Sequence, residues 1–386
     1  MKLIDVCELI VDCPHSTAND EGTGYPLIRT PNVGKGRLIL DGVHRVPKEV
    51  YDVRNARAIP QPGDLILARE APAGNVALIQ DGQQVCLGQR TVLIRPDKTK
   101  VYPPYLAYYM LAPYAQHELK SAANGATVAH VNMPKIRGLN IELPEMSEQV
   151  RIGNILSAYD DLIATNQKQI SLLEEAAQRI YKEWFIDFHF PGHEFAPFED
   201  GIPEGWSRKM LGDIAINAGI NVSVSDREKY SYYLPIDCMP KKSLGYIEVN
   251  NISLAESSLQ CFKPGDIVMG AMRPYFHKVV IARDNGLTRN TCFVINAKNP
   301  IYHDFLALLI FDERSIDYAT QNSVGTTMPY VRWKDFIQLP IIVPDDSVAQ
   351  KFSRFISPMI NAIHNRAIDI QKASVSRDLL LAKLLS

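Results

Sequence analysis

Two long stretches of the chain place apolar side chains in alternating steps of four and three residues. One stretch lies between Pro144 and Pro191, and the other follows Pro344. This spacing is the heptad pattern of a helix that packs along another helix. We therefore predict long helices over residues 146–190 and 345–386. The positions of the pattern are Ile152, Leu156, Tyr159, Ile163, Asn166, Ile170, Leu173, Ala177, Ile180 and Trp184 in the first stretch, and Phe352, Ile356, Met359, Ile363, Arg366, Ile370, Ala373, Arg377, Leu380 and Leu384 in the second.

Polar residues interrupt this apolar pattern at equivalent positions, Asn166 in the first helix and Arg366 in the second. Each of them either lies at the exposed edge of the helix pairing or makes a polar contact that sets the register of the helices. The sequence leaves both interpretations open. Ser147 is a candidate N-cap for the first helix, and Pro358 can kink the second.

The remaining chain has the pattern of two strand-rich domains, over residues 1–145 and, with a linker, over residues 191–344. In each domain a short apolar run follows a Pro-Gly-Asp turn, and a run of β-branched and aromatic residues comes later. A stretch with the mixed apolar spacing of a buried helix follows, then a Gly-Thr loop and a last strand that ends in proline. The predicted fold class is α+β, with two strand-rich domains separated by the long helices.

The two strand-rich domains also resemble each other in sequence. Residues 125–144 align with residues 325–344 without a gap. Three further blocks align in the same order, at offsets of 200, 202 and 208 residues toward the N-terminus. Four blocks in one order indicate an internal duplication.

In a duplicated chain the two apolar helices are expected to pack on each other, antiparallel and about a pseudo-two-fold axis. A helix of about 36 residues is roughly 54 Å long at 1.5 Å per residue. Such a pair would hold two similar domains at opposite ends of a rod. This arrangement suits the reading of two DNA segments that are separated by a fixed spacer.

The charge distribution limits what the chain does alone. The net charge is −2, and residues 1–145 carry 16 basic and 15 acidic side chains, whereas residues 208–344 carry 15 and 13. Affinity for DNA of any sequence comes mainly from neutralised phosphates. If DNA is the target, we therefore expect other subunits to supply much of the phosphate contact.

The composition is that of a globular chain, with 46% hydrophobic and 22% charged residues. The sequence contains no apolar run long enough to span a membrane and no signal-peptide pattern, so we expect a cytoplasmic protein without a membrane partner. The six cysteines do not have metal-ligand spacing, so we expect no metal in this chain.

Residues 148–192 resemble the central conserved region of the specificity subunits of Type I restriction–modification enzymes. The shared features are the Glu-Gln pair after a proline-ended strand, Leu-Ser-x-x-Asp-Asp-x-Ile, Asn-x-x-x-Ile-x-x-Leu-Glu, and Trp-Phe-x-x-Phe before Pro-Gly. The order of recognition domain, conserved helix, recognition domain and conserved helix covers essentially the whole chain.

This resemblance implies that each strand-rich domain reads one half of a bipartite target in double-stranded DNA, and that the paired helices set the spacer. It further implies two modification subunits that dock on the helices, bind S-adenosylmethionine and methylate adenine. Restriction subunits would add ATP- and Mg-dependent cleavage. This chain would hold no cofactor itself.

Side chains that read base edges are most often Arg, Lys, Asn and Gln, because their donors match the edges of the bases. Many of them contact phosphate instead. The candidates for DNA contact in the first domain are Arg29, Lys35, Arg37, Arg69, Arg90, Thr127, His130 and Asn132. Those in the second domain are Lys241, Lys242, Arg273, Tyr275, His277, Lys278, Arg289, Thr327, Tyr330 and Arg332. Arg69 with Arg273, and Arg90 with Arg289, fall in equivalent regions of the two domains.

We predict no catalytic residue in the chain. The run Tyr-Pro-Pro-Tyr at residues 102–105 resembles an adenine-methyltransferase motif, but its first residue lacks the required acceptor and no glycine-rich cofactor turn precedes it. No phosphate-binding Gly-x-x-x-x-Gly-Lys loop occurs. A second hypothesis remains, a duplicated coiled-coil scaffold whose strand-rich domains bind proteins.

Overall fold

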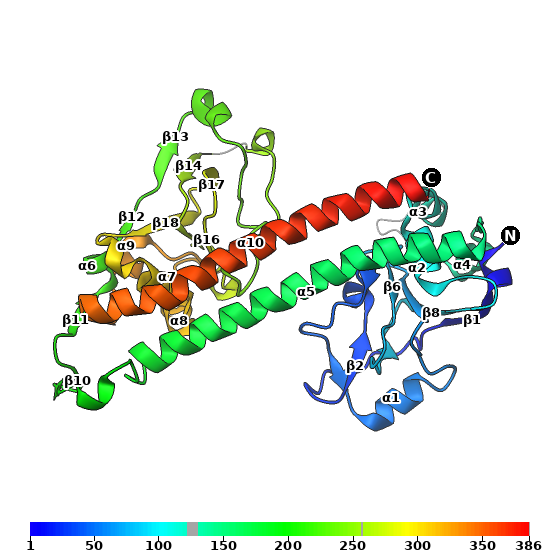
Figure 1. Ribbon diagram of the computed structural model, residues 1–386, viewed down its shortest axis with the longest axis horizontal. Coiled ribbons are helices and arrows are strands. Elements are labelled where there is room, and N and C mark those ends of the chain that lie inside the picture. The colour runs from blue at the N-terminus through cyan, green and yellow to red at the C-terminus, as the bar shows by residue number, and fades with distance from the viewer. Residues whose placement is uncertain (122–129, 256–257, 386) are drawn as a thin grey trace. The chain divides into compact units, whose positions relative to one another are not determined.

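The computed structural model describes residues 1–121, 130–255 and 258–385 (Figure 1). The chain mixes helices with several β-sheets and forms two compact units. The first unit comprises Met1–Ile163 and Ala373–Ser386, and the second comprises Ala164–Lys372. These units divide each long helix, so they differ from the four consecutive segments that the sequence suggested.

A five-stranded sheet forms the centre of the first unit, in the order β1-β8-β5-β6-β3, and a smaller sheet has the order β4-β2-β7. Strand β5 lies antiparallel to both β8 and β6. The strands are β1 Cys7–Asp12, β2 Tyr25–Ile28, β3 Gly36–Arg37, β4 Arg45–Val46, β5 Leu65–Ala68, β6 Val76–Leu78, β7 Cys86–Leu87 and β8 Thr91–Pro96.

The larger sheet of the first unit is buried on both faces, which explains the continuous apolar run of β5. Leu65 and Leu67 face the cluster that contains the helices, whereas Ile66 and Ala68 face a second apolar cluster. The helices and turns of this unit are η1 Leu3–Val6, η2 Thr30–Asn32, α1 Lys48–Arg54, α2 Pro103–Leu111, α3 Pro113–Lys120 and α4 Met133–Gly138.

The second unit contains a four-stranded sheet in the order β12-β18-β15-β16 and a three-stranded sheet in the order β13-β14-β17. Strands β11 and β19 form a separate antiparallel pair, as do β9 and β10. The strands are β9 Phe198–Glu199, β10 Ile202–Pro203, β11 Ser207–Met210, β12 Ala215–Asn217, β13 Ile220–Val222, β14 Leu259–Phe262, β15 Ile267–Gly270, β16 Val279–Ile281, β17 Gly286–Arg289, β18 Cys292–Ala297 and β19 Pro340–Val343.

Helices of the second unit cover one face of its larger sheet. Ile267 and Met269 of β15 share a cluster with these helices, while Val268 between them faces the opposite cluster. The helices and turns are η3 His193–Phe195, α6 Leu211–Ile214, η4 Val224–Lys229, η5 Ile252–Leu254, η6 Pro274–Phe276, η7 Pro300–Tyr302, α7 His303–Phe311, α8 Glu313–Gln321 and α9 Trp333–Phe336.

The two larger sheets share a strand order. The order β12-β18-β15-β16 of the second unit repeats the order β1-β8-β5-β6 of the first. In the first unit Ala68 pairs with Thr91, and in the second Gly270 pairs with Cys292. These pairs place β8 and β18 at an offset of 201 residues, one residue more than the sequence alignment gave for this block.

The predicted long helices are present as α5 Met146–Phe185 and α10 Asp346–Leu384. α5 ends five residues before the predicted boundary at 190. The backbone carbonyl of Glu145 accepts a hydrogen bond from the backbone N–H of Gln149. Glu145 is therefore the N-cap residue of α5, in place of Ser147, which the sequence suggested. Pro358 lies within α10, which continues through it.

Every residue of the heptad pattern is buried or half-buried. Asn166 is only 3% exposed, which excludes the solvent-exposed edge for this residue. Arg366 is half-buried and pairs with Asp369 on its own helix. The fully buried members are Ile152, Leu156, Asn166, Ile170, Ala177, Trp184, Phe352, Ile356, Ile363, Ile370 and Ala373, and the half-buried members are Tyr159, Ile163, Leu173, Ile180, Met359, Arg366, Arg377, Leu380 and Leu384.

Within each unit, parts of both long helices share an apolar core. In the first unit Leu156 near the start of α5 lies in one cluster with Leu385, directly after α10. In the second unit the rings of Trp184 and Phe352 lie 5.6 Å apart, which brings the end of α5 against the start of α10. Across the described part of the chain, no helix is both long enough and apolar enough to cross a membrane.

Candidate DNA-binding surface

Three residues of the first unit meet where strand β5 ends. The two carboxylate oxygens of Glu70 contact different partners: Oε2 lies 2.8 Å from Nη1 of Arg90, and Oε1 lies 2.6 Å from Nδ1 of His130. Arg90 and His130 are exposed, whereas the Glu70 side chain is mostly buried. The sequence therefore predicted two members of this group, Arg90 and His130, but not the acid that joins them.

Arg69 contacts His130 from the buried side of this group of three residues, which we call the first corner. Its guanidinium pairs with Asp12 at 2.8 Å, donates to the carbonyl of Val131 at 2.9 Å and lies 2.9 Å from Nε2 of His130. Arg69 is only 8% exposed. We therefore assign this predicted DNA contact to the internal structure of the unit, because a buried and fully engaged guanidinium does not reach a base.

The other first-unit candidates have different partners or surroundings. Arg37 pairs with Asp161 on α5, and Asn132 caps α4 by accepting the backbone N–H of Lys135 at 3.0 Å. Arg29 is half-buried beside a short 3₁₀ turn, and Lys35 is exposed. Thr127 lies outside the described residues.

In the second unit, Arg273 joins two segments that are distant in the sequence. Its backbone N–H donates to Pro329 at 2.7 Å, and its Nη2 lies 3.5 Å from the carbonyl of Thr327. Arg273 has a φ of +49°, in the left-handed region, and this conformation turns the chain there. Tyr275, Thr327 and Tyr330 are exposed around it, so four sequence candidates lie on one rim.

Four other candidates of the second unit have partners within it, namely Lys241, Lys242, His277 and Lys278. His277 is 3% exposed, and its Nε2 contacts the carbonyl of Phe311 at 2.8 Å. Burial lowers the pKa of His277, which favours the neutral ring. Lys278 donates to the carbonyl of Ile236, Lys242 pairs with Glu313, and Lys241 lies over the ring of Phe276. We assign His277 to the core, and the half-buried Lys278 to an internal contact with Ile236 rather than to DNA.

Arg289 and Arg332 are exposed and each has a local partner. Arg289 donates to the hydroxyl of Tyr233, and Arg332 pairs with Asp335 at the start of α9. Arg332 also interacts electrostatically with Tyr330 on the Arg273 rim. Met328, which the sequence reasoning passed over because it has no polar donor, is 55% exposed on that rim.

The backbone shows which positions of the two units correspond. In the first unit the N–H of Arg69 donates to the carbonyl of Arg90, and in the second the N–H of Ala271 donates to the carbonyl of Thr291. The backbone N–H of Val131 donates to the carbonyl of Arg69, and the backbone N–H of Val331 donates in the same way to the carbonyl of Ala271. Arg69 and Arg90 therefore correspond to Ala271 and Thr291, which corrects the pairing with Arg273 and Arg289.

The same comparison extends to the exposed positions. Glu70 and His130 of the first unit correspond to Met272 and Tyr330 of the second, which form an isolated β-bridge. One corner therefore carries charged groups, and its counterpart carries a thioether and a phenol on the same backbone framework. Two domains that read different sequences would differ in this way, because base edges are recognised by side-chain chemistry.

A comparison with protein families identifies the family to which this chain belongs. A family model described as the Type I restriction modification DNA specificity domain matches residues 1–175 and 203–371. The chain belongs to this family. The match includes both corners described above and most of both long helices.

Individual relatives agree with this assignment. This chain is 28% identical to the Type I restriction enzyme MjaIX specificity subunit of Methanocaldococcus jannaschii, over 99% of this chain and 91% of the relative. The EcoDI specificity subunit of Escherichia coli is 24% identical over 66% of this chain and 62% of the relative. A crystal structure of the S subunit from M. genitalium has the same fold, with a TM-score of 0.62, 13% identity, and coverage of 100% of this chain and 95% of that one.

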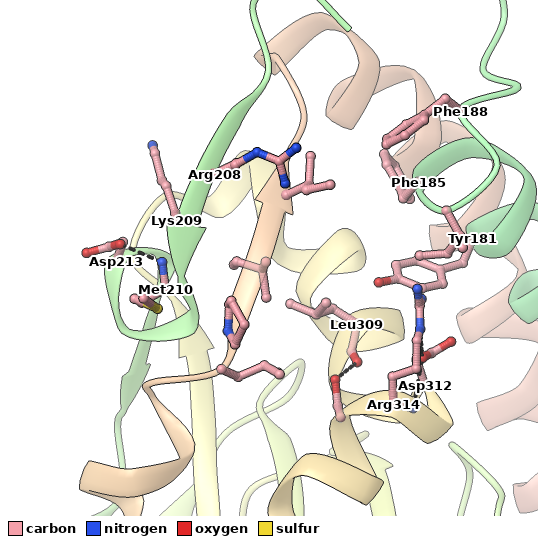
Figure 2. A pocket seen from close by; sticks show the side chains of 16 residues that line it. Tyr181, Phe185, Phe188, Arg208, Lys209, Met210, Asp213, Leu309, Asp312 and Arg314 are labelled. Carbon is pink, nitrogen blue, oxygen red and sulfur yellow. Dashed lines mark hydrogen bonds and ion pairs between the residues drawn. The ribbon is translucent and has the colours of Figure 1, made fainter. Parts of the chain in front are cut away.

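A cavity of about 600 Å³ lies in the second specificity domain, away from the Arg273 rim. Figure 2 shows the rings of Tyr181, Phe185 and Phe188 on one side of it and Arg208 of β11 on another. In the first domain the hydroxyl of Tyr109, at an offset of 200 from Leu309, lies 3.3 Å from the carbonyl of Asn140. Leu309, which has no hydroxyl group, lines the cavity in the second domain.

Among the residues that the structure describes, no group of three or more His, Cys, Asp and Glu side chains is placed to hold a metal ion. Tyr102, the first residue of the Tyr-Pro-Pro-Tyr run, donates its hydroxyl to Asn154 of α5, and its backbone N–H donates to Gln149. These contacts join α2 to the long helix, so the run has a structural use.

Proposed function

We propose that this chain is the DNA-reading subunit of a Type I restriction–modification complex, and that each specificity domain reads one half of a bipartite target. The observation that carries this proposal is the pair of corresponding corners. Glu70, Arg90 and His130 occupy one, while their counterparts on the other are Met272, Thr291 and Tyr330. A duplicated framework with different side chains at the same exposed positions is suited to reading two different short sequences.

We further propose that α5 and α10 pair antiparallel and set the spacer between the two half-sites. The contacts within each unit support this direction, because Leu156 near the start of α5 clusters with Leu385, whereas Trp184 at the end of α5 contacts Phe352 near the start of α10. The helices contain 40 and 39 residues. At 1.5 Å per residue each is about 60 Å long, or roughly 17 base pairs of B-DNA.

Two modification subunits would dock on the helical regions, bind S-adenosylmethionine and methylate adenine. Restriction subunits would bring ATP and Mg for cleavage, and the assembly would act in the cytoplasm, where its DNA lies. Large apolar side chains remain exposed on the long helices, among them Leu172, Val375 and Leu379.

A domain exchange tests the proposal. Residues 1–145 would be replaced with the corresponding domain of a relative, and the complex with the cognate modification subunit would be expressed in cells without other methyltransferases. The methylated motif, determined by sequencing the genomic DNA, is expected to change in one half only. A change in both halves, or in neither, would contradict the assignment of one half-site to each domain.

A further inference from the structure

We infer that Arg90 reads a guanine in the half-site of the first specificity domain and that Glu70 is the residue that orients it. This inference rests on the proposed function and adds one side chain, one base and one positioning residue to it. Arg90 has a φ of +63°, so the chain turns at this residue directly before strand β8. Its side chain is 63% exposed, and its Nη1 is held 2.8 Å from Glu70.

The contacts around His130 identify its protonation form. Arg69 has only donors, so Nε2 of His130 must accept from its Nη2 at 2.9 Å. The proton of the neutral ring therefore lies on Nδ1 and is donated to Oε1 of Glu70 at 2.6 Å. Both ring nitrogens are thus occupied. His130 has no nitrogen left for a base edge, although the sequence made it a candidate.

Glu70 is consequently fixed from one side. Its carboxylate accepts from His130, His130 accepts from Arg69, and Arg69 is locked by a buried ion pair with Asp12. The second oxygen of Glu70 then holds Arg90. A guanidinium that is restrained in this way loses less conformational entropy when it binds, which is the advantage of a preorganised contact.

Among the described contacts, only one terminal nitrogen of Arg90 is engaged by a side chain, so its Nε and Nη2 remain available in the planar fork. Two parallel donors match the O6 and N7 acceptors of guanine in the major groove, whereas adenine presents a donor at the position of O6. A lysine has no such fork. A phosphate also accepts two parallel donors of a guanidinium. However, the second domain has Thr291 at the position of Arg90, and a phosphate contact carries no sequence information. This difference between the two domains points to guanine rather than to a phosphate.

The second domain has different residues at the positions of Glu70, Arg90 and His130. Thr291 stands at the position of Arg90, Met272 at that of Glu70 and Tyr330 at that of His130. The inference therefore assigns the guanine contact to the first half-site alone.

The test uses the full chain in complex with its cognate modification subunit, with methylated motifs read from genomic DNA. The variants are Arg90→Ala, Arg90→Lys and Glu70→Gln, and Lys48→Ala is the control because Lys48 also forms an exposed ion pair in the first unit, with Asp52 on α1. We expect Arg90→Ala and Arg90→Lys to relax one G·C position of the first half-site, with discrimination falling about 5- to 150-fold. Glu70→Gln should relax the same position less, and Lys48→Ala should leave the motif unchanged.

Arg90→Lys keeps the charge and the exposed position, so it remains informative if Arg90→Ala fails to fold. An unchanged motif with uniformly weaker methylation in both Arg90 variants would identify a phosphate contact and overturn the inference. Relaxation in the second half-site would also overturn it. If the unmodified chain directs no bipartite motif at all, the proposed function fails instead, which separates the two conclusions.

Discussion

Asp160 and Arg377 form a buried ion pair, with Oδ1 of Asp160 2.7 Å from Nη1 of Arg377, although 217 residues separate them in the chain. The pair connects α5 to α10 within the first unit. The other oxygen of Asp160 accepts the hydroxyl of Tyr108 on α2 at 2.6 Å. Burial is the main cause of the raised pKa of Tyr108, so this hydroxyl keeps its proton and remains a donor. One carboxylate therefore fixes the first recognition domain to both long helices.

Replacing Asp160 with asparagine should strongly destabilise the chain. The change removes the buried partner of Arg377 and leaves only its pair with the exposed Asp378. The loss should therefore fall toward the lower end of the range of about 3–5 kcal/mol that breaking a buried pair costs. Urea denaturation would measure the free energy of unfolding. Asp369→Asn is the matched control, because the side chains of its pair with Arg366 are 44% and 42% exposed and the pair should contribute about 1 kcal/mol or less. Equal losses in the two variants would show that burial of the Asp160 pair adds nothing.

His364 should make the second unit sensitive to acid. Its Nε2 contacts the carbonyl of Ile281 on β16 at 3.0 Å, and burial lowers the pKa of His364 below its ordinary value of 6.5. Because the unfolded chain takes up this proton first, the free energy of unfolding should fall as the pH drops below about 6.5. His364→Gln keeps a donor but does not titrate. The stability difference between the original chain and this variant should therefore shrink between pH 7.5 and 5.5, and a constant difference would refute the argument.

Lengthening both long helices should lengthen the DNA spacer. One heptad duplicated in each helix, at residues 164–170 and 366–372, adds about 10.5 Å at 1.5 Å per residue, or roughly three base pairs. The methylated motif of the variant complex would show the new spacing. A control with seven residues added to the linker at 196–201 should keep the original spacer. If the heptad variant also keeps it, the helices do not act as the ruler.

Salt dependence should distinguish a DNA reader from a protein-binding scaffold. The complex with the modification subunit is expected to lose affinity for its methylation target steeply as salt rises, because phosphate contacts release counterions. Fluorescence anisotropy with a labelled duplex between 50 and 200 mM salt, about the range over which this effect is large, would measure it. A complex that binds duplex DNA with no salt dependence, or not at all, would favour the scaffold.

Local patterns in the sequence predicted the elements well, and long-range contacts account for most of what they missed. The heptad spacing of α5 and α10 is a property of consecutive residues, so it identified both helices and their buried face. Whether Asn166 was buried could not be predicted, because that depends on what faces it. Asp160 and Glu174 are also buried on α5. Their partners Arg377, Tyr108 and Ser243 lie between 52 and 217 residues away.

The candidate DNA contacts show the same limit. The sequence identified basic and amide side chains but could not separate exposed from buried ones, because Arg69 is buried by Asp12 and Val131, 57 and 62 residues distant. Glu70 was missed because a search for groups that bind DNA selects hydrogen-bond donors. Glu70 is an acceptor, and it acts by holding the donor Arg90. The one-residue change in offset between β8 and β18 concealed which positions of the two domains correspond.

The most direct test of the central claim is the methylome of cells that express this chain with its cognate modification subunit. The account predicts a new methyladenine motif with two short defined halves and a fixed gap, and with a G·C pair in the half that residues 1–145 control. Co-purification would establish that the complex forms. A stable complex that introduces no such motif would contradict the claim that these two domains read DNA.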